Sequence, residues 1–298
     1  MVWGTDGRLR ATIPLDLGRE PHWFDPLTAI SSERRVYVQP RTGDVVGFRW
    51  GKDAKGDWTE VVARDADTGR TRSTVRLPDY YDDLEFTSDG RRWAGARGHS
   101  AEVVVLDTRT GREVFTTPAR KQFARPPTRF SPDDRMLAVG GDDGRLVLFE
   151  CATGRERVTF THIGNIGFGS IVFSPDGRWL VAHSAGDPFV VWDVHGELDR
   201  PKNPPDVAAL EKAWADLASE DAKAGFVAVR LMAAFPKESL AFLREKTAPD
   251  GLRAVRAVEA VEWMATPDAV KLLERWAGGA AGSRLADEAK AALARLRR

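Results

Sequence analysis

The sequence predicts a mainly β chain that ends in an α-helical domain, with four repeated units of four antiparallel strands followed by helical hairpins. Two observations predict this fold class. The first is a pair of motifs that recurs at 42 to 44 residue intervals along the first two thirds of the 298-residue chain. The second is a change beyond residue 206 to an Ala-rich composition, in which apolar residues recur with the 3.6-residue period of an α-helix.

The repeated motifs are both turn motifs. Phe-Thr-Ser-Asp-Gly-Arg at residues 86–91 is followed by Phe-Ser-Pro-Asp-Asp-Arg at 130–135 and Phe-Ser-Pro-Asp-Gly-Arg at 173–178. In the second motif an apolar run ends in an acidic residue and a glycine follows three or four residues later, as in Asp107 and Gly111. Pro presets φ, Asp accepts local backbone hydrogen bonds and Gly permits positive φ. Both motifs therefore predict tight turns between short strands.

The period and the literal pairs Trp192-Asp193 and Gly98-His99 resemble the WD40-repeat family. The resemblance implies a β-propeller built from blades of four antiparallel strands, a fold that binds other proteins. The other copies of the Trp-Asp pair are degenerate, so we expect apolar packing to replace most of the family's buried hydrogen-bond network. The positions that correspond to the family's structural pair are Trp192, Asp193, Asp107, Asp65 and Glu150.

We expect the propeller-like part to span residues 1–198, with repeats at about 10–69, 70–111, 112–154 and 155–196. Four blades lie at the lower end of the propeller range. Three arrangements stay open: an open arc, a ring completed by a second copy, and a fragment of a larger multidomain WD40 regulatory protein. An open arc exposes apolar blade edges and favours self-association. The long first repeat predicts an enlarged hairpin loop at residues 51–57.

The remaining chain reads as a linker and a helical tail. Three prolines between residues 197 and 206 predict a semi-rigid linker at 199–206, and helices are expected over 207–298. Ser219, Asp250, Thr266 and Ser283 are predicted helix caps. Residues 214–222 and 266–273 resemble the HEAT-like tail that follows WD40 arrays in large bacterial multidomain proteins. We expect the charged positions Arg253, Arg256, Glu259 and Glu262 to face solvent.

The composition excludes several classes of protein. Lys and Arg number 44 and so do Asp and Glu, so no net charge attracts nucleic acid or a membrane. The single cysteine, Cys151, forms no intramolecular disulfide, which is typical of a reducing compartment. No long apolar run or signal sequence is visible, and the expected location is cytoplasmic. We find no motif for a catalytic residue, a cofactor or a metal, so the prediction is a non-enzymatic protein, with an axial propeller enzyme as an alternative.

Two groups of loop residues are candidate binding sites. Aromatic residues between blades are typical anchors for protein partners. The predicted partner-binding residues are Trp23, Phe24, Tyr80, Tyr81, Phe123, Arg125 and Phe168. A basic cluster within residues 120–129 could hold an acidic peptide or a single nucleic-acid strand. Its residues are Arg120, Lys121, Arg125 and Arg129. The leading hypothesis is a scaffold that binds other proteins through its rim loops and helical tail.

Overall fold

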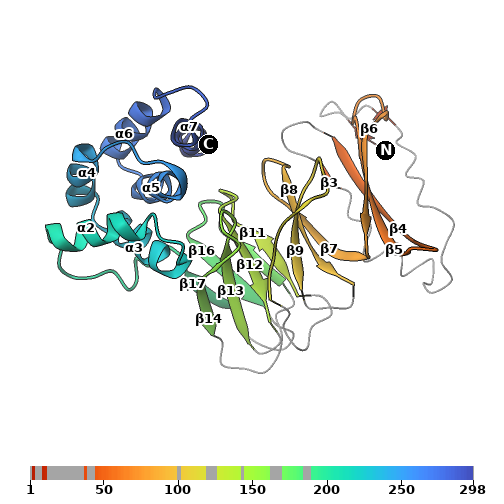
Figure 1. Ribbon diagram of the computed structural model, residues 1–298, viewed down its shortest axis with the longest axis horizontal. Helices are drawn as coiled ribbons and strands as arrows, with labels where there is room; N and C mark the ends of the chain where they lie inside the picture. The colour runs from red at the N-terminus through yellow and green to blue at the C-terminus, as the bar shows by residue number, and fades with distance from the viewer. Residues whose placement is uncertain are drawn as a thin grey trace. The chain divides into compact units, whose positions relative to one another are not determined.

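The computed structural model describes residues 44–98, 102–118, 126–141, 144–161, 170–183 and 189–297, together with the strands at 2–3, 9–11 and 37–38 (Figure 1). The strands are β1 (Val2–Trp3), β2 (Leu9–Ala11), β3 (Tyr37–Val38), β4 (Val45–Asp53), β5 (Gly56–Arg64), β6 (Thr71–Pro78), β7 (Tyr81–Phe86), β8 (Arg92–Arg97), β9 (Val103–Asp107), β10 (Glu113–Thr116), β11 (Thr128–Phe130), β12 (Met136–Gly140), β13 (Arg145–Glu150), β14 (Glu156–Thr161), β15 (Ser170–Phe173), β16 (Trp179–His183) and β17 (Val190–Asp193). The helices are α2 (Val207–Asp216), α3 (Ala222–Ala234), α4 (Pro236–Glu245), α5 (Gly251–Met264), α6 (Pro267–Ala277) and α7 (Arg284–Leu296).

Four antiparallel sheets are each formed by strands that follow one another in the chain. We number them sheet 1 (β3–β6), sheet 2 (β7–β10), sheet 3 (β11–β14) and sheet 4 (β15–β17); β1 and β2 form a separate pair. Short turns between consecutive strands favour this arrangement, because antiparallel neighbours need only a hairpin to connect them. The predicted fold class, antiparallel sheets followed by helices, is confirmed. Sheet 4 has three strands among the described residues where four were expected.

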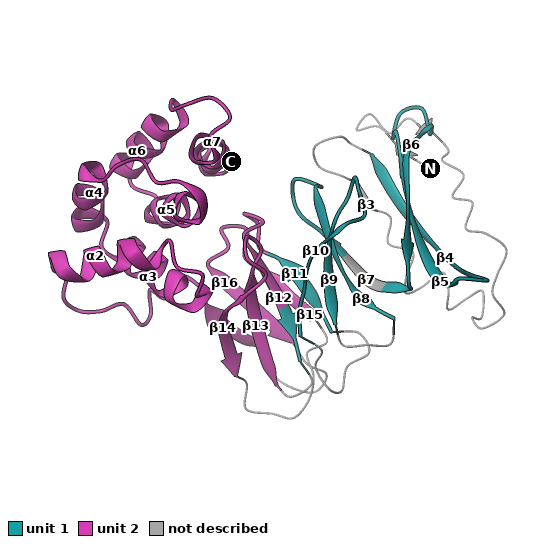
Figure 2. Cartoon of the chain, viewed as in Figure 1, with its two compact units in different colours: residues 1–130, 139–143, 165–168 teal, residues 131–138, 144–164, 169–298 magenta. Residues whose placement is uncertain are grey.

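The chain divides into two compact units (Figure 2). Unit 1 contains residues 1–130, 139–143 and 165–168, and unit 2 contains residues 131–138, 144–164 and 169–298. Within unit 1, sheet 1 packs face to face on sheet 2 through an apolar cluster. This cluster contains Val46, Phe48, Val61, Ala63, Leu77, Tyr81, Trp93, Val104 and Leu106. Apolar packing thus joins these two sheets, as the degenerate motifs predicted.

The first turn motif is held by a hydroxyl group and a positive φ. The Ser131 oxygen accepts a hydrogen bond from the Met136 backbone at 2.9 Å and donates one to Asp133; Thr87 and Ser174 make the corresponding pairs in sheets 2 and 4. The last turn residue has φ of 68° at Gly90, 74° at Gly177 and 62° at Asp134. Asp tolerates this left-handed conformation better than most side chains do, so the turn persists where sheet 3 lacks the glycine.

The predicted loop at residues 51–57 is wrong. The extra residues lengthen the hairpin itself, since β4 and β5 pair continuously from Val45 and Arg64 to Asp53 and Gly56, with two residues between the strands. Gly56 closes the turn with a φ of 122°. The Trp58 indole of β5 packs over Gly51 of β4, where an added Cβ would overlap the ring. This cross-strand packing explains why the segment stays extended.

Four of the six described helices begin with a side-chain cap. Side chains of Asp206, Asp221, Thr266 and Ser283 accept hydrogen bonds from the first turns of α2, α3, α6 and α7. The predictions for Thr266 and Ser283 are confirmed. Ser219 is not the cap of α3, because the N-cap is Asp221, two residues later. Asp250 makes no capping hydrogen bond from its side chain. Among the helices described, none combines the length and the apolar character needed to cross a bilayer.

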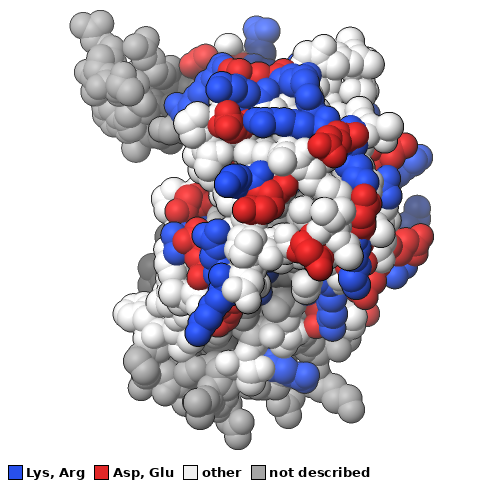
Figure 3. Space-filling model, turned by 90° about the vertical axis from the view of Figure 1, so that its left-hand side faces the viewer, with Lys and Arg blue, Asp and Glu red and all other residues white. Residues whose placement is uncertain are grey.

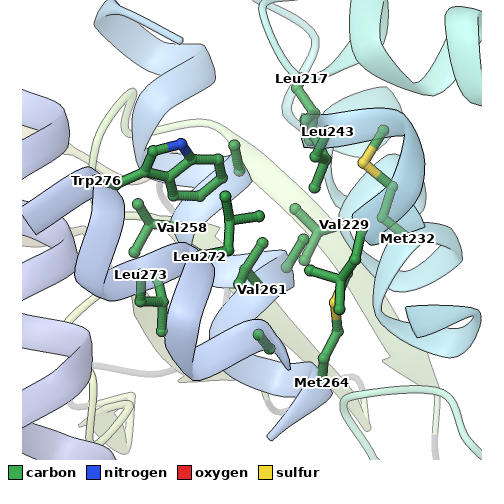
Figure 4. Packing of buried hydrophobic residues seen from close by; sticks show 14 of the residues in the cluster. Leu217, Val229, Met232, Leu243, Val258, Val261, Met264, Leu272, Leu273 and Trp276 are labelled. Carbon is green, nitrogen blue, oxygen red and sulfur yellow. The ribbon is translucent and has the colours of Figure 1, made fainter. Parts of the chain in front are cut away.

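Charged side chains of both signs lie on one face of the molecule, and apolar side chains fill the helical part. Lys and Arg are interspersed with Asp and Glu over the face drawn in Figure 3. Beneath the surface, α2 to α7 share one apolar core that includes Leu217, Val229, Met232, Val258, Val261, Leu272 and Trp276 (Figure 4). α5 lies within this core and has ten buried residues. A helix that is apolar around most of its circumference belongs at the centre of a helical domain.

We expect Gly111→Ala to destabilise the protein more than Gly98→Ala. Both residues belong to unit 1 and have positive φ, of 67° and 55°. A Cβ at Gly111 would lie 2.7 Å from Val75 Cγ1 and 2.8 Å from Leu77 Cδ2, whereas a Cβ at Gly98 meets nothing within 4 Å. Gly98→Ala should lower the free energy of unfolding by about 1 kcal/mol, and Gly111→Ala by about 1–3 kcal/mol more. Urea unfolding followed by tryptophan fluorescence measures both, and equal losses would contradict the steric argument.

Candidate interaction surfaces

The acidic residue of the second turn motif closes its own turn in sheets 1 and 2. Asp65 Oδ1 accepts hydrogen bonds from the backbone and the hydroxyl of Thr68, at 2.7 and 2.8 Å. Asp107 makes the same two bonds with Thr110, both at 2.8 Å. Both Asp side chains lie at the surface. Hydrogen bonds from Arg72 and Thr68 lower the pKa of the Asp65 carboxyl, and those from Thr110 lower the pKa of Asp107. At these positions the acid is a turn residue.

Glu150 occupies the corresponding position in sheet 3 and does more than close a turn. It still accepts a hydrogen bond from the Thr153 hydroxyl, at 2.7 Å. Its side chain is longer than that of Asp by one methylene, is 1% exposed, and receives two guanidinium groups. Arg157 of β14 donates to Oε1 at 2.7 Å, and Arg256 of α5 donates to both oxygens at 2.8 Å. A bidentate guanidinium pair of this kind is strong and directional.

Arg256 joins three parts of unit 2. Besides the two bonds to Glu150, its Nη1 donates to the carbonyl oxygens of Leu217 at 3.1 Å and Ser219 at 2.7 Å, just beyond the end of α2. Carbonyls at a helix C-terminus lack partners in the helix and favour a cation. Gly225 of α3 leaves room for this side chain, because an added Cβ would overlap the guanidinium. The glycine lies inside a helix, where it costs about 1 kcal/mol relative to Ala, and the passage of Arg256 explains its presence.

Two glutamates of α5 continue the network. Glu259 accepts hydrogen bonds from Arg157 at 2.6 and 2.8 Å, and both side chains are fully buried. One helical turn later, Glu262 accepts from Arg135 at 2.7 Å and from Arg295 of α7 at 2.7 and 2.8 Å. Arg135 belongs to the first turn of sheet 3. α5 is therefore bound to sheet 3 through both of the repeated turn regions.

The expectation that these charged positions of α5 face solvent is wrong for three of the four. Arg256 and Glu259 are 0% exposed and Glu262 is 8% exposed, while Arg253 is half-buried and donates to the Trp214 carbonyl at 3.2 Å. A charge pattern with the helical period is typical of a solvated face, but here each of the three buried charges pairs with an opposite charge on another element. The sequence signal was the run of alanines and valines between these charges, which indicated burial of α5 on most sides.

The network shifts the pKa of its carboxyl groups. Burial alone would raise the pKa of Glu150, but the hydrogen bonds from Arg256 and the charge of Arg157 outweigh burial and lower it to about 2. Burial dominates at Glu259 and raises the pKa of that carboxyl in spite of Arg157. One carboxylate of the cluster is thus held firmly ionised, while the ionisation of the other is opposed by its surroundings.

His195 lies beside this cluster, after β17. Its ring stacks on Trp263 of α5 with centroids 3.8 Å apart, and its backbone carbonyl accepts a hydrogen bond from Arg230 at 3.2 Å. Nε2 is buried and has no hydrogen-bond partner among the described residues. Burial lowers the pKa of His195 to about 4, and the nearby Asp133 and Asp176 oppose this only in part. The imidazole is therefore neutral near pH 7.

The predicted partner-binding residues fall mostly outside the described residues: Trp23, Phe24, Phe123, Arg125 and Phe168 do so. Tyr80 is half-buried, with its ring 5.8 Å from that of Trp50. Tyr81 is 1% exposed and packs edge-on against Trp93 at 5.4 Å. The prediction that Tyr81 is a surface anchor is therefore wrong. Tyr81 is the first residue of β7 and its side chain lies in the core between sheets 1 and 2. The rest of this patch stays a prediction.

The predicted basic cluster is described at one position only. Arg120, Lys121 and Arg125 lie outside the described residues. Arg129 belongs to strand β11 and its Nη1 lies 2.9 and 3.0 Å from the two carboxylate oxygens of Glu85 in β7. Its charge is therefore engaged within unit 1. Within the described residues, no three His, Cys, Asp or Glu side chains are close enough together to hold a metal ion.

Of the positions that correspond to the family's structural pair, Asp193 keeps the role of turn residue. Its carboxylate accepts from Gly196 at 3.0 Å and from Leu198 at 2.7 Å. Trp192 stacks on Phe160 of sheet 3 with centroids 5.5 Å apart. Both lie at the end of β17, where the repeat stops and the chain continues toward α2. At Gly196 an added Cβ would overlap the Arg230 guanidinium, so α3 contacts the chain at this point.

Sheet 4 carries an exposed apolar surface. Val172 and Val191 are each 54% exposed, and Phe189 is 70% exposed with its ring against His183 at 4.9 Å. Val172 pairs with Val181, which pairs with Val191, so the three valines cross the sheet in one row. Such a row on a sheet face is typical of a contact surface.

Comparison with known proteins supports the fold. No protein-family model matches the chain. Over 79 residues it is 30% identical to the small ribosomal subunit protein RACK1 of Caenorhabditis elegans, a WD40 protein. The fold is WD40-like. The match covers 26% of this chain and 23% of RACK1, so the chain spans about a quarter of the curated relative. The likeness to WD40 proteins agrees with four successive antiparallel sheets and their repeated turns.

Glu150→Gln should destabilise the protein strongly, by about 3–5 kcal/mol, because it leaves buried guanidinium groups without their counter-charge and turns an amide toward their donors. Asp107→Asn is the matched control at the same repeat position in sheet 2. It keeps its Oδ1 acceptor and should cost about 0.5–1.5 kcal/mol. Chemical denaturation measures both, and a loss at Glu150 no larger than at Asp107 would contradict the role of the cluster. Glu150→Gln combined with Arg256→Met should cost less than the sum of the single changes.

Acid should destabilise the folded chain through His195. The unfolded chain binds a proton at the ordinary pKa of 6.5, whereas the folded chain binds it at about 4. Stability from this residue is therefore fully present above pH 6.5 and is lost as the pH falls toward 4. His195→Phe keeps an aromatic ring on Trp263 but does not titrate. The free energy of unfolding, measured against pH, should fall less steeply in this window for the variant, and parallel profiles would disprove the assignment.

Proposed function

We propose that this chain is a non-enzymatic scaffold that binds protein partners through the loops of its WD40-like sheets and through its helical part. The observation that carries the proposal is the series of antiparallel sheets with repeated turns, together with the likeness to RACK1. Sheets of this kind offer broad and rigid surfaces for other proteins.

The rim aromatics supply the binding residues in this proposal. Tyr80 represents them among the described residues, since it lies half-exposed in the turn before β7, beside Trp50. Trp23, Phe24, Phe123, Arg125 and Phe168 are proposed members of the same surface. Aromatic side chains contribute large contact areas at low conformational cost. The chain has 44 Lys and Arg residues and 44 Asp and Glu residues, so it has no net positive charge to attract nucleic acid.

In this proposal the helices and sheet 3 form one rigid body, joined around Glu150. The proposed domain bounds are residues 1–198 for the sheets, 199–206 for the linker and 207–298 for a HEAT-like tail. Contacts of Glu150, Arg157 and Arg135 with α5 support a helical part that is held firmly on sheet 3. A partner could therefore contact turns of sheet 3 and helices at the same time. A cytoplasmic location remains a prediction.

Tyr80→Ser should weaken partner capture several-fold in affinity purification with the purified chain as bait, because it removes an aromatic anchor. Val114→Ser is the control, since Val114 is 43% exposed in β10 but belongs to no predicted patch. Quantitative mass spectrometry compares the proteins captured by each bait. The same proteins in the same amounts with all three baits would remove the rim surface from the proposal. Turnover of a substrate by the purified chain would contradict the non-enzymatic function.

A further inference from the structure

The outward face of sheet 4 has a clear apolar pattern. Val172, Val181 and Val191, which we call the valine row, lie opposite one another on β15, β16 and β17. Alternate residues on the same strands, such as Ile171, Phe173 and Leu180, are buried on the other face of the sheet. Successive side chains of a strand point to opposite faces. The valine row therefore belongs to the face that is turned away from the core.

Residues at the same repeat positions are buried in sheets 2 and 3. Counted from the turn motifs, Val181 corresponds to Ala94 in sheet 2 and Ala138 in sheet 3, and Val191 corresponds to Val105 and Leu148. All four of these earlier residues are 0% exposed. In sheet 4 the same positions keep apolar side chains, although Val191 is half-exposed. Terminal repeats normally carry a polar outer face when they end in solvent, so these valines indicate a covering surface.

A second copy of the chain offers two faces that could cover the row. The first is the outward face of sheet 1. Packing of sheet 4 on sheet 1 of the next copy would give a head-to-tail arrangement. On that face the row across the strands consists of Arg49, Glu60 and Arg76. Arg49 and Glu60 form an ion pair, and Arg76 lies 2.6 Å from Asp53. Packing apolar valines on these charges would remove water from them without supplying partners, which is costly.

The second face is the valine row itself. An apolar row is complementary to its own copy, and two-fold contacts that use the same patch on both chains are the commonest kind in homo-oligomers. We propose that sheet 4 packs on sheet 4 of a second copy about a two-fold axis, with the valine row at the centre. Trp179 lies at one end of this face and the Phe189–His183 pair at the other. Here the partner is another copy of this chain, and the inference is independent of which proteins the scaffold binds.

The size of the face predicts a weak dimer. Strands lie about 4.8 Å apart and rise about 3.3 Å per residue, so three short strands provide less than the roughly 800 Å² per partner of a standard stable interface. We therefore expect dissociation in the micromolar range. The dimer should form at high protein concentration and separate on dilution.

Sedimentation velocity over a concentration series of the full chain tests the proposal. The wild-type chain should change from monomer to dimer as its concentration rises. Val191→Lys and, separately, Val172→Lys should weaken dimerisation at least tenfold, because each places charges on both sides of the two-fold interface. Val114→Lys is the matched control, with a similarly exposed strand valine in sheet 2. Far-UV circular dichroism and thermal melting confirm that each variant is folded.

The sedimentation results distinguish a two-fold dimer of sheet 4 from the alternatives. Dimerisation that is weakened by both valine variants and unchanged by Val114→Lys supports the proposal. A monomer at every concentration overturns it, as does a dimer that survives Val191→Lys and Val172→Lys. Arg76→Glu separates the two arrangements: it leaves a two-fold dimer of sheet 4 unchanged and disrupts head-to-tail association through sheet 1. None of these outcomes bears on capture of other proteins through Tyr80, so the scaffold function is tested separately.

Discussion

The cluster of Glu150, Arg157, Arg256 and Glu259 is the interaction on which the rest of unit 2 depends. Four charges are buried together, and transfer of a single unpaired charge from water would cost several kcal/mol. Each charge here meets an opposite charge at 2.6 to 2.8 Å. Displacing α5 would leave these charges buried without their partners, which is strongly destabilising. The cluster thus defines one position of α5 on sheet 3.

One methylene group separates this function from an ordinary turn. In sheets 1 and 2 the acidic residue is Asp, whose short side chain closes its own turn and, at Asp65, also pairs with Arg72 of the next strand of the same sheet. Glu150 closes its turn through Thr153 and still reaches α5. The repeat therefore supplies a position that is preset by the backbone, and a longer side chain turns it into an anchor for the helices.

The end of the repeat has a different physical character. After β17 the chain keeps the Asp193 turn, but prolines follow and no fourth strand forms among the described residues. Contacts of Arg230 with His195 and of Trp263 with the imidazole hold the chain where it passes to the helices. The outward face of sheet 4 carries apolar residues at positions that are buried in sheets 2 and 3. Anchoring of the helices at sheet 3 leaves the valine row available for association.

The sequence by itself determined the local structure of this protein. Turn chemistry depends on residues within a few positions of each other, so the Ser-Pro-Asp-Gly and Asp-x-x-Thr-Gly motifs predicted the strands between them, and Thr266 and Ser283 predicted the starts of α6 and α7. The sequence did not reveal that the residues at 51–57 extend a hairpin, because a tryptophan from the paired strand decides it. Nor did it reveal the partners of Arg256 and Glu259, which lie about a hundred residues away. Tertiary structure decided whether those charges face water or each other, because burial and pairing depend on which elements pack together.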